Sequence, residues 1–177
     1  NTAIIRANYL TPEGIPFFRE GVKLYEGLAQ ELDFNLLFTQ TGRLDLGHTD
    51  SALFGLRLRT EFNQMLGVDS RMIGPEEIKE LVPPIDLREG KTLPIIGAMH
   101  HPPGGVIRHD GVIWGYARGA DRMGIELHPF TEVQGITKEN GRATGVETDQ
   151  GPIKAGTVVS ATAGWSSIIA RMVDLQL

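Results

Sequence analysis

A polar tripeptide, Arg108-His109-Asp110, lies between a glycine pair and a stretch with helical periodicity. Gly104-Gly105 ends a predicted rigid turn, and Asp110 is suited to cap a helix that we expect to run to about Met123. A side chain at such a strand-to-helix junction projects into the crevice where α/β sheets bind ligands. His109 is therefore a candidate binding residue, although the same junction is also compatible with a purely structural role.

Arg6 is the one strong anion-binding side chain in an apolar N-terminal stretch. Its planar guanidinium group can hold a carboxylate through two parallel hydrogen bonds, which makes Arg6 a candidate for substrate binding. The alternative is that Arg6 pairs with an acidic side chain elsewhere in the fold. The sequence pattern leaves both interpretations open.

Two adjacent histidines, His100 and His101, raise the question of a metal site, because imidazole is the commonest metal ligand. Neighbouring residues of a strand point to opposite faces, and no cysteine or acidic residue lies at a ligand spacing from the pair. We therefore expect no metal site at these positions.

A turn of small residues, 161–165, follows an apolar segment and precedes a helical one. Such a turn allows a cofactor's phosphate or ribose to approach the backbone closely, but a tight turn without a ligand explains it equally well. The chain contains no Gly-x-Gly-x-x-Gly motif, so it lacks the phosphate-binding turn of dinucleotide folds. No Ser-His-Asp order, carboxylate pair or nucleophile elbow stands out, which disfavours a hydrolase.

The composition of the 177 residues is that of a globular protein, with 41% hydrophobic residues and a net charge of −5. Lysine and arginine form no dense cluster, so nucleic acid is not an expected partner. The absence of cysteine fits a reducing compartment, and we expect the protein in the cytoplasm. No apolar run approaches the ~20 residues that cross a bilayer, so we expect no membrane association.

The first hundred residues show the patterns of an α+β unit. Apolar residues at three- and four-residue steps predict helices over 13–32 and 50–66, and proline at a first helical position predicts another over 75–81. Segments 34–38 and 42–46 are predicted as the two strands of a hairpin. Further strands are predicted at 72–73 and 93–99.

The remaining residues predict a strand–helix–strand piece with an inserted antiparallel meander. A strand over 106–109 precedes the helix that begins near Asp110, and Asn140-Gly141 is the strongest hairpin signal in the chain. A last helix is predicted over 164–175. The predicted fold class of the whole chain is α/β. The short strands expected after the helix that begins near Asp110 are 125–127, 131–138, 142–148, 153–155 and 158–160.

Several segments occur in the order found in the D-amino-acid-oxidase superfamily of FAD-dependent oxidoreductases. The chain is most similar there to the β subunits of heterotetrameric sarcosine oxidases. The most specific part is the Gly-Gly-x-x-Arg-His-Asp run followed by Trp114, and the resemblance covers essentially the whole chain. The segments that carry it are 1–9, 23–28, 97–98, 104–110 and 161–166.

The resemblance implies a flavin domain interleaved with a substrate domain. Residues 8–104 would form the substrate-side α+β layer, whereas 1–7 and 105–177 would belong to a Rossmann-like FAD-binding domain. The glycine-rich turn of the family would precede Asn1, and its C-terminal flavin contacts would follow Leu177. The resemblance therefore also implies an internal fragment that we do not expect to be active alone.

The same resemblance implies contacts with FAD. Thr2 and Ile4 match a segment whose backbone lies along the FAD, and Val133 matches a position whose backbone recognises adenine. Ala161 and Gly164 match a turn near the phosphates of the cofactor.

A second flavin is implied by His109, which matches the attachment point of a covalent FMN in some relatives. Bonding one imidazole nitrogen to the flavin methyl carbon withdraws electron density from the flavin ring and raises its potential as an oxidant. Arg6 matches an arginine that relatives place near the flavin or the substrate carboxylate, and it is the candidate catalytic residue.

The function implied by the resemblance is oxidation of a secondary amine such as sarcosine, in which flavin takes a hydride, the imine is hydrolysed and O₂ reoxidises the flavin. The implied partners are a small amine or amino-acid substrate and the other subunits of a hetero-oligomeric oxidase. One alternative is a related FAD-dependent enzyme acting on dimethylglycine or another amino acid. Another is a non-catalytic module that packs against partner subunits.

Overall fold

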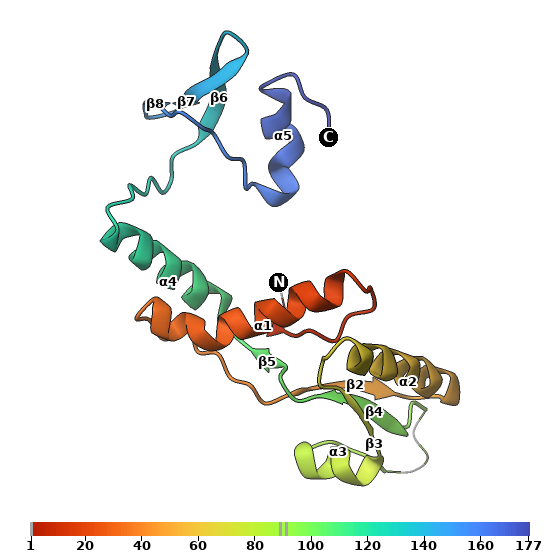
Figure 1. The fold of residues 1–177 in the computed structure, drawn as a ribbon. Helices are drawn as coiled ribbons and strands as arrows, with labels where there is room; N and C mark the ends of the chain where they lie inside the picture. Colours follow the sequence, from red (N-terminus) through yellow and green to blue (C-terminus); the bar gives the residue numbers. More distant parts are fainter. Residues whose placement is uncertain (1, 89, 91) are drawn as a thin grey trace. The chain divides into compact units, whose positions relative to one another are not determined.

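The computed structural model describes residues 2–88, 90 and 92–177. The chain divides into two compact units, residues 1–125 and 126–177, each of which contains helices and strands (Figure 1). This mixture confirms the predicted α/β class. Within the described part of the chain, no helix is long and apolar enough to cross a membrane.

A three-stranded antiparallel sheet forms one end of the first unit, with strand order β2-β4-β3. The central strand β4 is buried along its whole length, and its side chains alternate between two covering helices. A Cβ at Gly97 would lie 3.0 Å from Leu53 of α2, whereas Ala98 packs with Ile78 of α3. The elements are β2 (Arg43–Gly47), α2 (Asp50–Met65), β3 (Arg71–Ile73), α3 (Pro75–Leu81) and β4 (Gly97–His101).

The ends of both covering helices follow from local chemistry. The Thr49 hydroxyl accepts a hydrogen bond from the Ala52 amide at 3.1 Å and caps α2, which ends before Gly67 in a left-handed conformation. Pro75 is the first residue of α3, where its missing amide hydrogen costs nothing. The structure confirms both predicted helices and the short strand β3.

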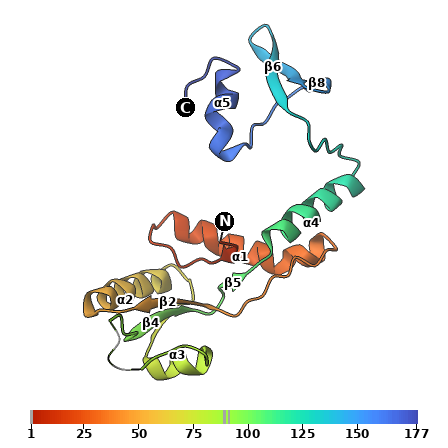
Figure 2. The same ribbon diagram turned by 180° about the vertical axis from the view of Figure 1, so that it is seen from behind.

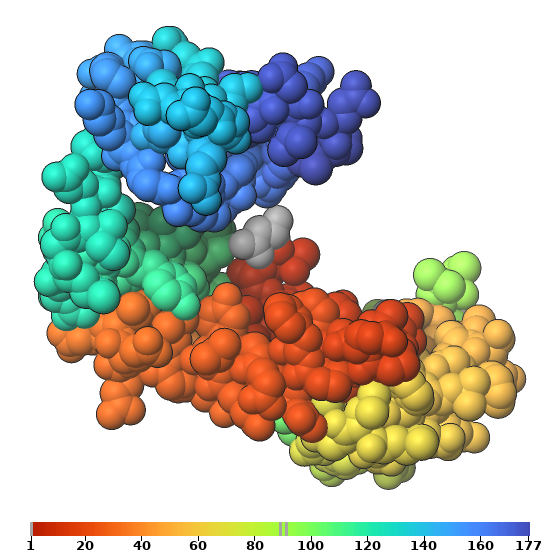
Figure 3. Space-filling model, turned by 45° about the horizontal axis from the view of Figure 1, so that its top comes forward, coloured from red at the N-terminus to blue at the C-terminus, as the bar shows by residue number. Residues whose placement is uncertain are grey.

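The long helix α1 (Gly14–Glu31) confirms the helix predicted over 13–32 and joins the two ends of this unit. Its first half packs Ile15 and Val22 against Ala7, and its last turns pack Leu28 against Ile107. The opposite face of α1, in red and orange in Figure 3, lies open at the surface of the unit. The helix therefore supports both the N-terminal segment and the start of α4.

A second, two-stranded sheet pairs β1 (Ile4–Ile5) with β5 (Gly105–Val106), and α4 (His109–Arg122) follows two residues later. Helix α4 lies beside the C-terminal end of α1 in both views (Figures 1 and 2). A Cβ at Gly115 would lie 2.9 Å from the Leu36 side chain, so a glycine permits this close approach.

The predicted hairpin of 34–38 with 42–46 is wrong. Strand β2 pairs with β4, and residues 34–38 form no strand, since the Asn35 side chain accepts the Leu37 amide and Leu37 has a φ of 52°. Thr39 instead forms an isolated bridge with Val106. Residues 43–47 form a strand, close to the predicted 42–46, but its partner β4 lies more than fifty residues further along the chain in most of the register. The strand predicted at 93–99 is found at 97–101, where it pairs with residues 43–47 of β2.

The second unit contains the predicted meander, with strand order β6-β7-β8. Asn140 and Gly141 have φ angles of 51° and 76° and form the predicted two-residue hairpin turn. Residues 125–127 and 158–160 form no strands, and the last helix is shorter than predicted because a 3₁₀ turn precedes it. The elements are β6 (Val133–Glu139), β7 (Arg142–Thr148), β8 (Gly151–Lys154), η1 (Ala163–Trp165) and α5 (Ser166–Arg171).

Candidate functional site

The junction of β1, β5 and α4 surrounds an apolar pocket in the first unit. The Ile107 amide donates to the Ala3 carbonyl at 2.9 Å, and β1 pairs with β5 in the register Ile4 to Val106, which brings β1 alongside the start of α4. The pocket has a volume of about 240 Å³. Its lining residues are Ala3, Ile4, Ile5, Tyr25, Ile107, His109, Val112 and Ile113.

His109 is the first residue of α4, and its exposed side chain is the one imidazole on the pocket wall. Among the residues that the structure describes, none forms a hydrogen bond with its ring. Both imidazole nitrogens are therefore available to a ligand or to a covalent bond.

The neighbours of His109 pair with each other and leave the imidazole alone. Arg108 donates from Nε and Nη2 to the two carboxylate oxygens of Asp110, at 3.1 and 2.8 Å. The hydrogen bond from Arg108 is the main reason that the pKa of Asp110 falls to about 2. The predicted capping role of Asp110 is wrong: Arg108 is the N-cap residue, and Asp110 lies within the first helical turn.

Arg6 follows β1 and is held without an ionic partner. Its Nη1 donates to Asn8 Oδ1 at 3.3 Å, and its guanidinium carbon lies 4.2 Å from the centre of the Tyr9 ring. Tyr9 in turn stacks on Phe18 of α1, with ring centres 3.8 Å apart. No carboxylate of the described residues lies within ion-pair distance of Arg6, so the interpretation of Arg6 as the partner of an internal acid finds no such acid.

Behind Arg6 lies a network of polar side chains centred on Asp45 of β2. Asp45 accepts hydrogen bonds from Asn8 Nδ2 at 2.7 Å and from Arg59 Nη2 at 2.6 Å, and it also pairs with Arg43. Burial opposes ionisation of this carboxyl, but the hydrogen bond from Arg43 and the charges of Arg59 and Arg43 outweigh it and lower its pKa. Asp45 is therefore a fixed negative charge.

The buried His101 fixes the backbone next to Arg6. Its Nε2 accepts the Ala7 amide at 3.2 Å and its Nδ1 lies 2.6 Å from the Asp69 carbonyl, so the neutral ring carries its proton on Nδ1. Burial lowers the pKa of His101, which keeps this form. His100 points to the other face, and no group of three potential ligands for a metal ion occurs among the described residues. The histidine pair is thus part of the packing of β4.

Three other predicted residues lie in the second unit. Val133 begins β6 and is half buried, while Ala161 and Gly164 are exposed in the turn before α5. A Cβ on Gly164 would meet no atom within 4 Å, so packing within the described residues does not require a glycine there. Ser166 Oγ donates to the Ala163 carbonyl at 2.7 Å and closes the turn.

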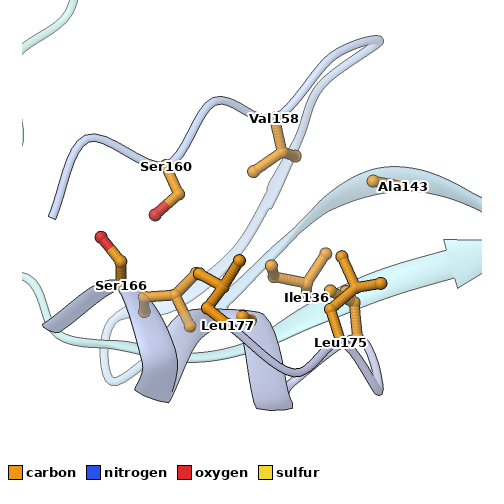
Figure 4. Close-up of a pocket in the computed structure, with 10 residues that line it drawn as sticks. Ile136, Ala143, Val158, Ser160, Ser166, Leu175 and Leu177 are labelled. Carbon is orange, nitrogen blue, oxygen red and sulfur yellow. The ribbon is translucent and has the colours of Figure 1, made fainter.

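An apolar pocket of about 330 Å³ lies behind this turn, between the meander and α5. Figure 4 shows the Ser160 and Ser166 hydroxyls turned toward each other at one end, with Ile136 and Leu175 at the other. The pocket offers apolar contact and few polar groups.

The structure thus brings Ile4 and His109 to one pocket and places Arg6 just after β1. Thr2 is exposed at the N-terminal end of the described chain. Sequence reasoning missed Asn8 and Asp45, although the spacing Arg43-x-Asp45 places both charges on one face of a strand and could have indicated a paired site.

Comparison with known proteins identifies the family of the chain. The family described as DAO, FAD dependent oxidoreductase, matches residues 1–177. The chain is 40% identical over all 177 residues to sarcosine oxidase subunit beta of an Arthrobacter species and 41% identical to that of Rhizobium meliloti. It covers 44% and 42% of those two proteins, so it spans less than half of their length.

Solved structures show the same fold. The L-proline dehydrogenase of P. horikoshii superimposes with a TM-score of 0.86 at 32% identity, over 96% of this chain and 43% of that one. Glycine oxidase from Geobacillus kaustophilus has a TM-score of 0.87 at 21% identity, over 99% of this chain and 47% of that one, and supports the fold alone. The chain belongs to the DAO family of FAD-dependent oxidoreductases.

Proposed function

We propose that the protein containing this chain oxidises a small secondary amino acid, of which sarcosine is the example, and that Arg6 binds the substrate carboxylate. The observation that carries the proposal is the state of Arg6. Its guanidinium is fixed by Asn8 and Tyr9, yet no carboxylate of the described residues neutralises it directly. A positioned and uncompensated guanidinium is suited to a carboxylate ligand. The identity of about 40% to sarcosine oxidase β subunits along the whole chain supports the same choice of substrate.

The pocket at β1 and α4 fits a flavin ring. Its aliphatic lining suits a flat aromatic group, and His109 at its wall has both ring nitrogens available. We propose covalent FMN attachment at His109. When bound, the flavin supplies a hydride acceptor that O₂ reoxidises. Arg108 and Asp110 pair with each other, so that the His109 imidazole remains the reactive group of the tripeptide.

FAD contacts are proposed at Thr2, Ile4, Val133, Ala161 and Gly164. The open space in front of Gly164 supports a close approach of a phosphate or ribose to this turn. The division into a substrate layer, 8–104, and flavin-domain parts, 1–7 and 105–177, remains part of the proposal. The compact units that end and begin at 125 and 126 reflect contacts within the chain and do not test it.

In this proposal the chain's own residues bind and orient the substrate. Arg6 holds the carboxylate and so sets the direction of the amine and of the carbon that loses hydride. Water then hydrolyses the imine, which releases the former methyl carbon as formaldehyde and leaves glycine. The side chains of Ile4, Ile107 and Ile113 offer apolar contact on the flavin side of the pocket.

The chain spans less than half of its curated relatives, so we propose that it is the middle part of a longer subunit. The other subunits of a hetero-oligomeric oxidase are its proposed partners. The family's remaining flavin contacts and a residue that activates the amine would then lie in parts of the protein beyond these 177 residues.

Two relatives favour other functions. The chain is 25% identical over 156 residues to the mitochondrial dimethylglycine dehydrogenase of Rattus norvegicus, which favours a tertiary amino acid as substrate. It is 28% identical over 144 residues to the pyruvate dehydrogenase phosphatase regulatory subunit of Mus musculus, which favours a non-catalytic role.

Substrate profiling of the whole protein separates these functions. Sarcosine is expected to cause O₂ consumption with formaldehyde release, and dimethylglycine and glycerol phosphate are expected to give little. Activity on dimethylglycine without activity on sarcosine would select the first alternative. For the second, the isolated chain is titrated calorimetrically with FAD and FMN, and submicromolar binding would contradict a purely structural module.

The covalent flavin has its own test. After denaturation of the whole protein in acid, yellow colour is expected to remain with the precipitate. His109→Ala should release all of this colour, whereas His128→Ala, at an exposed histidine in the second unit, should retain it. A colourless wild-type precipitate would overturn the attachment at His109 without touching the proposed amine oxidation.

A further inference from the structure

Arg6 contacts the buried side chain of Asn8, which in turn contacts the partly buried Asp45, and the proposed reaction uses neither of them directly. We infer that Asn8, held in place by Asp45, is a positioning residue that aims the Arg6 guanidinium at the substrate carboxylate. This inference rests on the proposed role of Arg6.

The Asn8 amide has one orientation that satisfies it. Asn8 is fully buried, its Oδ1 accepts from Arg6 Nη1 at 3.3 Å, and its Nδ2 donates to Asp45 Oδ2 at 2.7 Å. Turning the amide over would place its NH₂ group against a guanidinium and its oxygen against a carboxylate. Both contacts would become repulsive, and the fully buried Asn8 amide could not turn to solvent instead. The orientation of Asn8, and with it the acceptor offered to Arg6, is therefore set by Asp45.

Asp45 is itself fixed and fully engaged. Arg59 and Arg43 both donate to it, and the side chains of Asp45 and Arg59 are only 16% and 17% exposed. Because two guanidinium groups already compensate this carboxylate, it does not draw Arg6 away into an ion pair. Asn8 thus bridges Asp45 and Arg6, so that Asp45 fixes the position of Arg6 without neutralising it. The positive charge of Arg6 stays available to a ligand.

The remaining sides of Arg6 are also defined. Tyr9 supports the flat face of the guanidinium and is stacked on Phe18, and His101 holds the adjacent Ala7 amide. Asn8 is the one hydrogen-bond acceptor for the guanidinium among the described residues. Its removal should leave the charge of Arg6 in place but free its side chain to rotate, so that carboxylate binding has to order it again.

The expected effects are measured as dissociation constants of acetate, a carboxylate without an oxidisable amine, from the change it causes in the flavin absorption of the whole oxidised protein. Arg6→Ala should weaken acetate binding by about 10- to 100-fold, the usual range for a hydrogen-bonded charge. Asn8→Ala should weaken it by about three- to tenfold. In the Arg6→Ala background, Asn8→Ala should have no further effect, because Asn8 acts only through Arg6.

Thr60→Val is the matched control for loss of a buried polar group. Thr60 is buried in α2, and among the described residues its hydroxyl bonds only to the Leu56 carbonyl and the Met72 sulfur. It should bind acetate as the wild type does. If Asn8→Ala fails to retain flavin, Asn8→Ser provides a smaller perturbation at the same position, with weaker binding of acetate again expected only when Arg6 is present.

The outcomes are distinct. Weaker acetate binding in the Arg6 variant but not in either Asn8 variant would overturn the positioning role alone. A loss of equal size in the presence and absence of Arg6 would also overturn it, because Asn8 would then act on the fold and not on the guanidinium. Unchanged acetate binding in Arg6→Ala would overturn the proposed function, and this inference with it.

Discussion

Replacing Gly105 by alanine tests why two glycines precede the Arg108-His109-Asp110 tripeptide. A Cβ at position 105 would lie 2.6 Å from the Thr39 carbonyl oxygen, 2.8 Å from a Phe38 ring carbon and 3.1 Å from the Gln40 Cα. Two of these atoms belong to the backbone and cannot rotate away. The bridge between Thr39 and Val106, with hydrogen bonds of 2.9 and 3.0 Å, would have to open.

The expected cost follows from these contacts. Overpacking a tight site costs about 1–3 kcal/mol, and loss of one bridge hydrogen bond adds about 1 kcal/mol. We therefore expect Gly105→Ala to lower the free energy of unfolding by about 3 kcal/mol. With a urea dependence of about 2 kcal/mol per molar, the midpoint should fall by about 1.5 M.

The assay is urea unfolding of the chain in a Trp165→Phe background, so that the fluorescence reports on Trp114 of α4 in the same unit. Gly111→Ala is the control, because the nearest atoms to its Cβ lie at 3.6 Å and alanine favours the helix by up to about 1 kcal/mol. A shift below about 0.3 M in Gly105→Ala, or a shift equal to that of Gly111→Ala, would refute the steric argument.

Three further predictions concern stability. Burial lowers the pKa of His101 below its usual 6.5, so the unfolded chain binds more protons at acid pH than the folded chain does. The free energy of unfolding should therefore fall as the pH drops below about 6.5, and it should fall less steeply in His101→Gln. Equal slopes in the two proteins would contradict this. Thr49→Ala should cost about 1 kcal/mol in urea unfolding and Thr49→Ser much less, because only the serine retains an acceptor for the Ala52 amide; equal losses would argue against the cap. Gly141→Ala should cost about 1–2 kcal/mol through its φ of 76°, seen as faster amide exchange across β6 and β7, whereas Gly156→Ala, at a glycine without a positive φ, should leave this exchange unchanged.

The elements that were predicted correctly carry their signals within a few residues. The cap at Thr49, the proline at the start of α3 and the Asn140-Gly141 turn each act on the backbone beside them. The hairpin of 34–38 with 42–46 failed because strand pairing depends on partners far along the chain. Gly104 and Gly105 were expected in a turn, but the crowding that requires glycine at position 105 comes from residues 38–40.

The site shows the same division. Arg6 and His109 could be proposed from residue type and position, since each is a side chain able to bind a ligand that follows an apolar segment. The Arg43-x-Asp45 spacing could have indicated an ion pair on one strand, but the contact of Asp45 with Asn8 could not be predicted, because 37 residues separate the two. The predicted cap at Asp110 failed for a local reason. Helix α4 begins one residue before Asp110, and the Asp110 carboxylate pairs with Arg108.

The most direct test of the account is anaerobic mixing of the whole protein with sarcosine while the flavin absorption is followed. We predict that sarcosine bleaches the flavin, that the rate saturates with sarcosine concentration, and that Arg6→Ala raises the concentration for half-saturation by about 10- to 100-fold. A flavin that dithionite bleaches but sarcosine leaves unchanged would contradict the proposed amine oxidation.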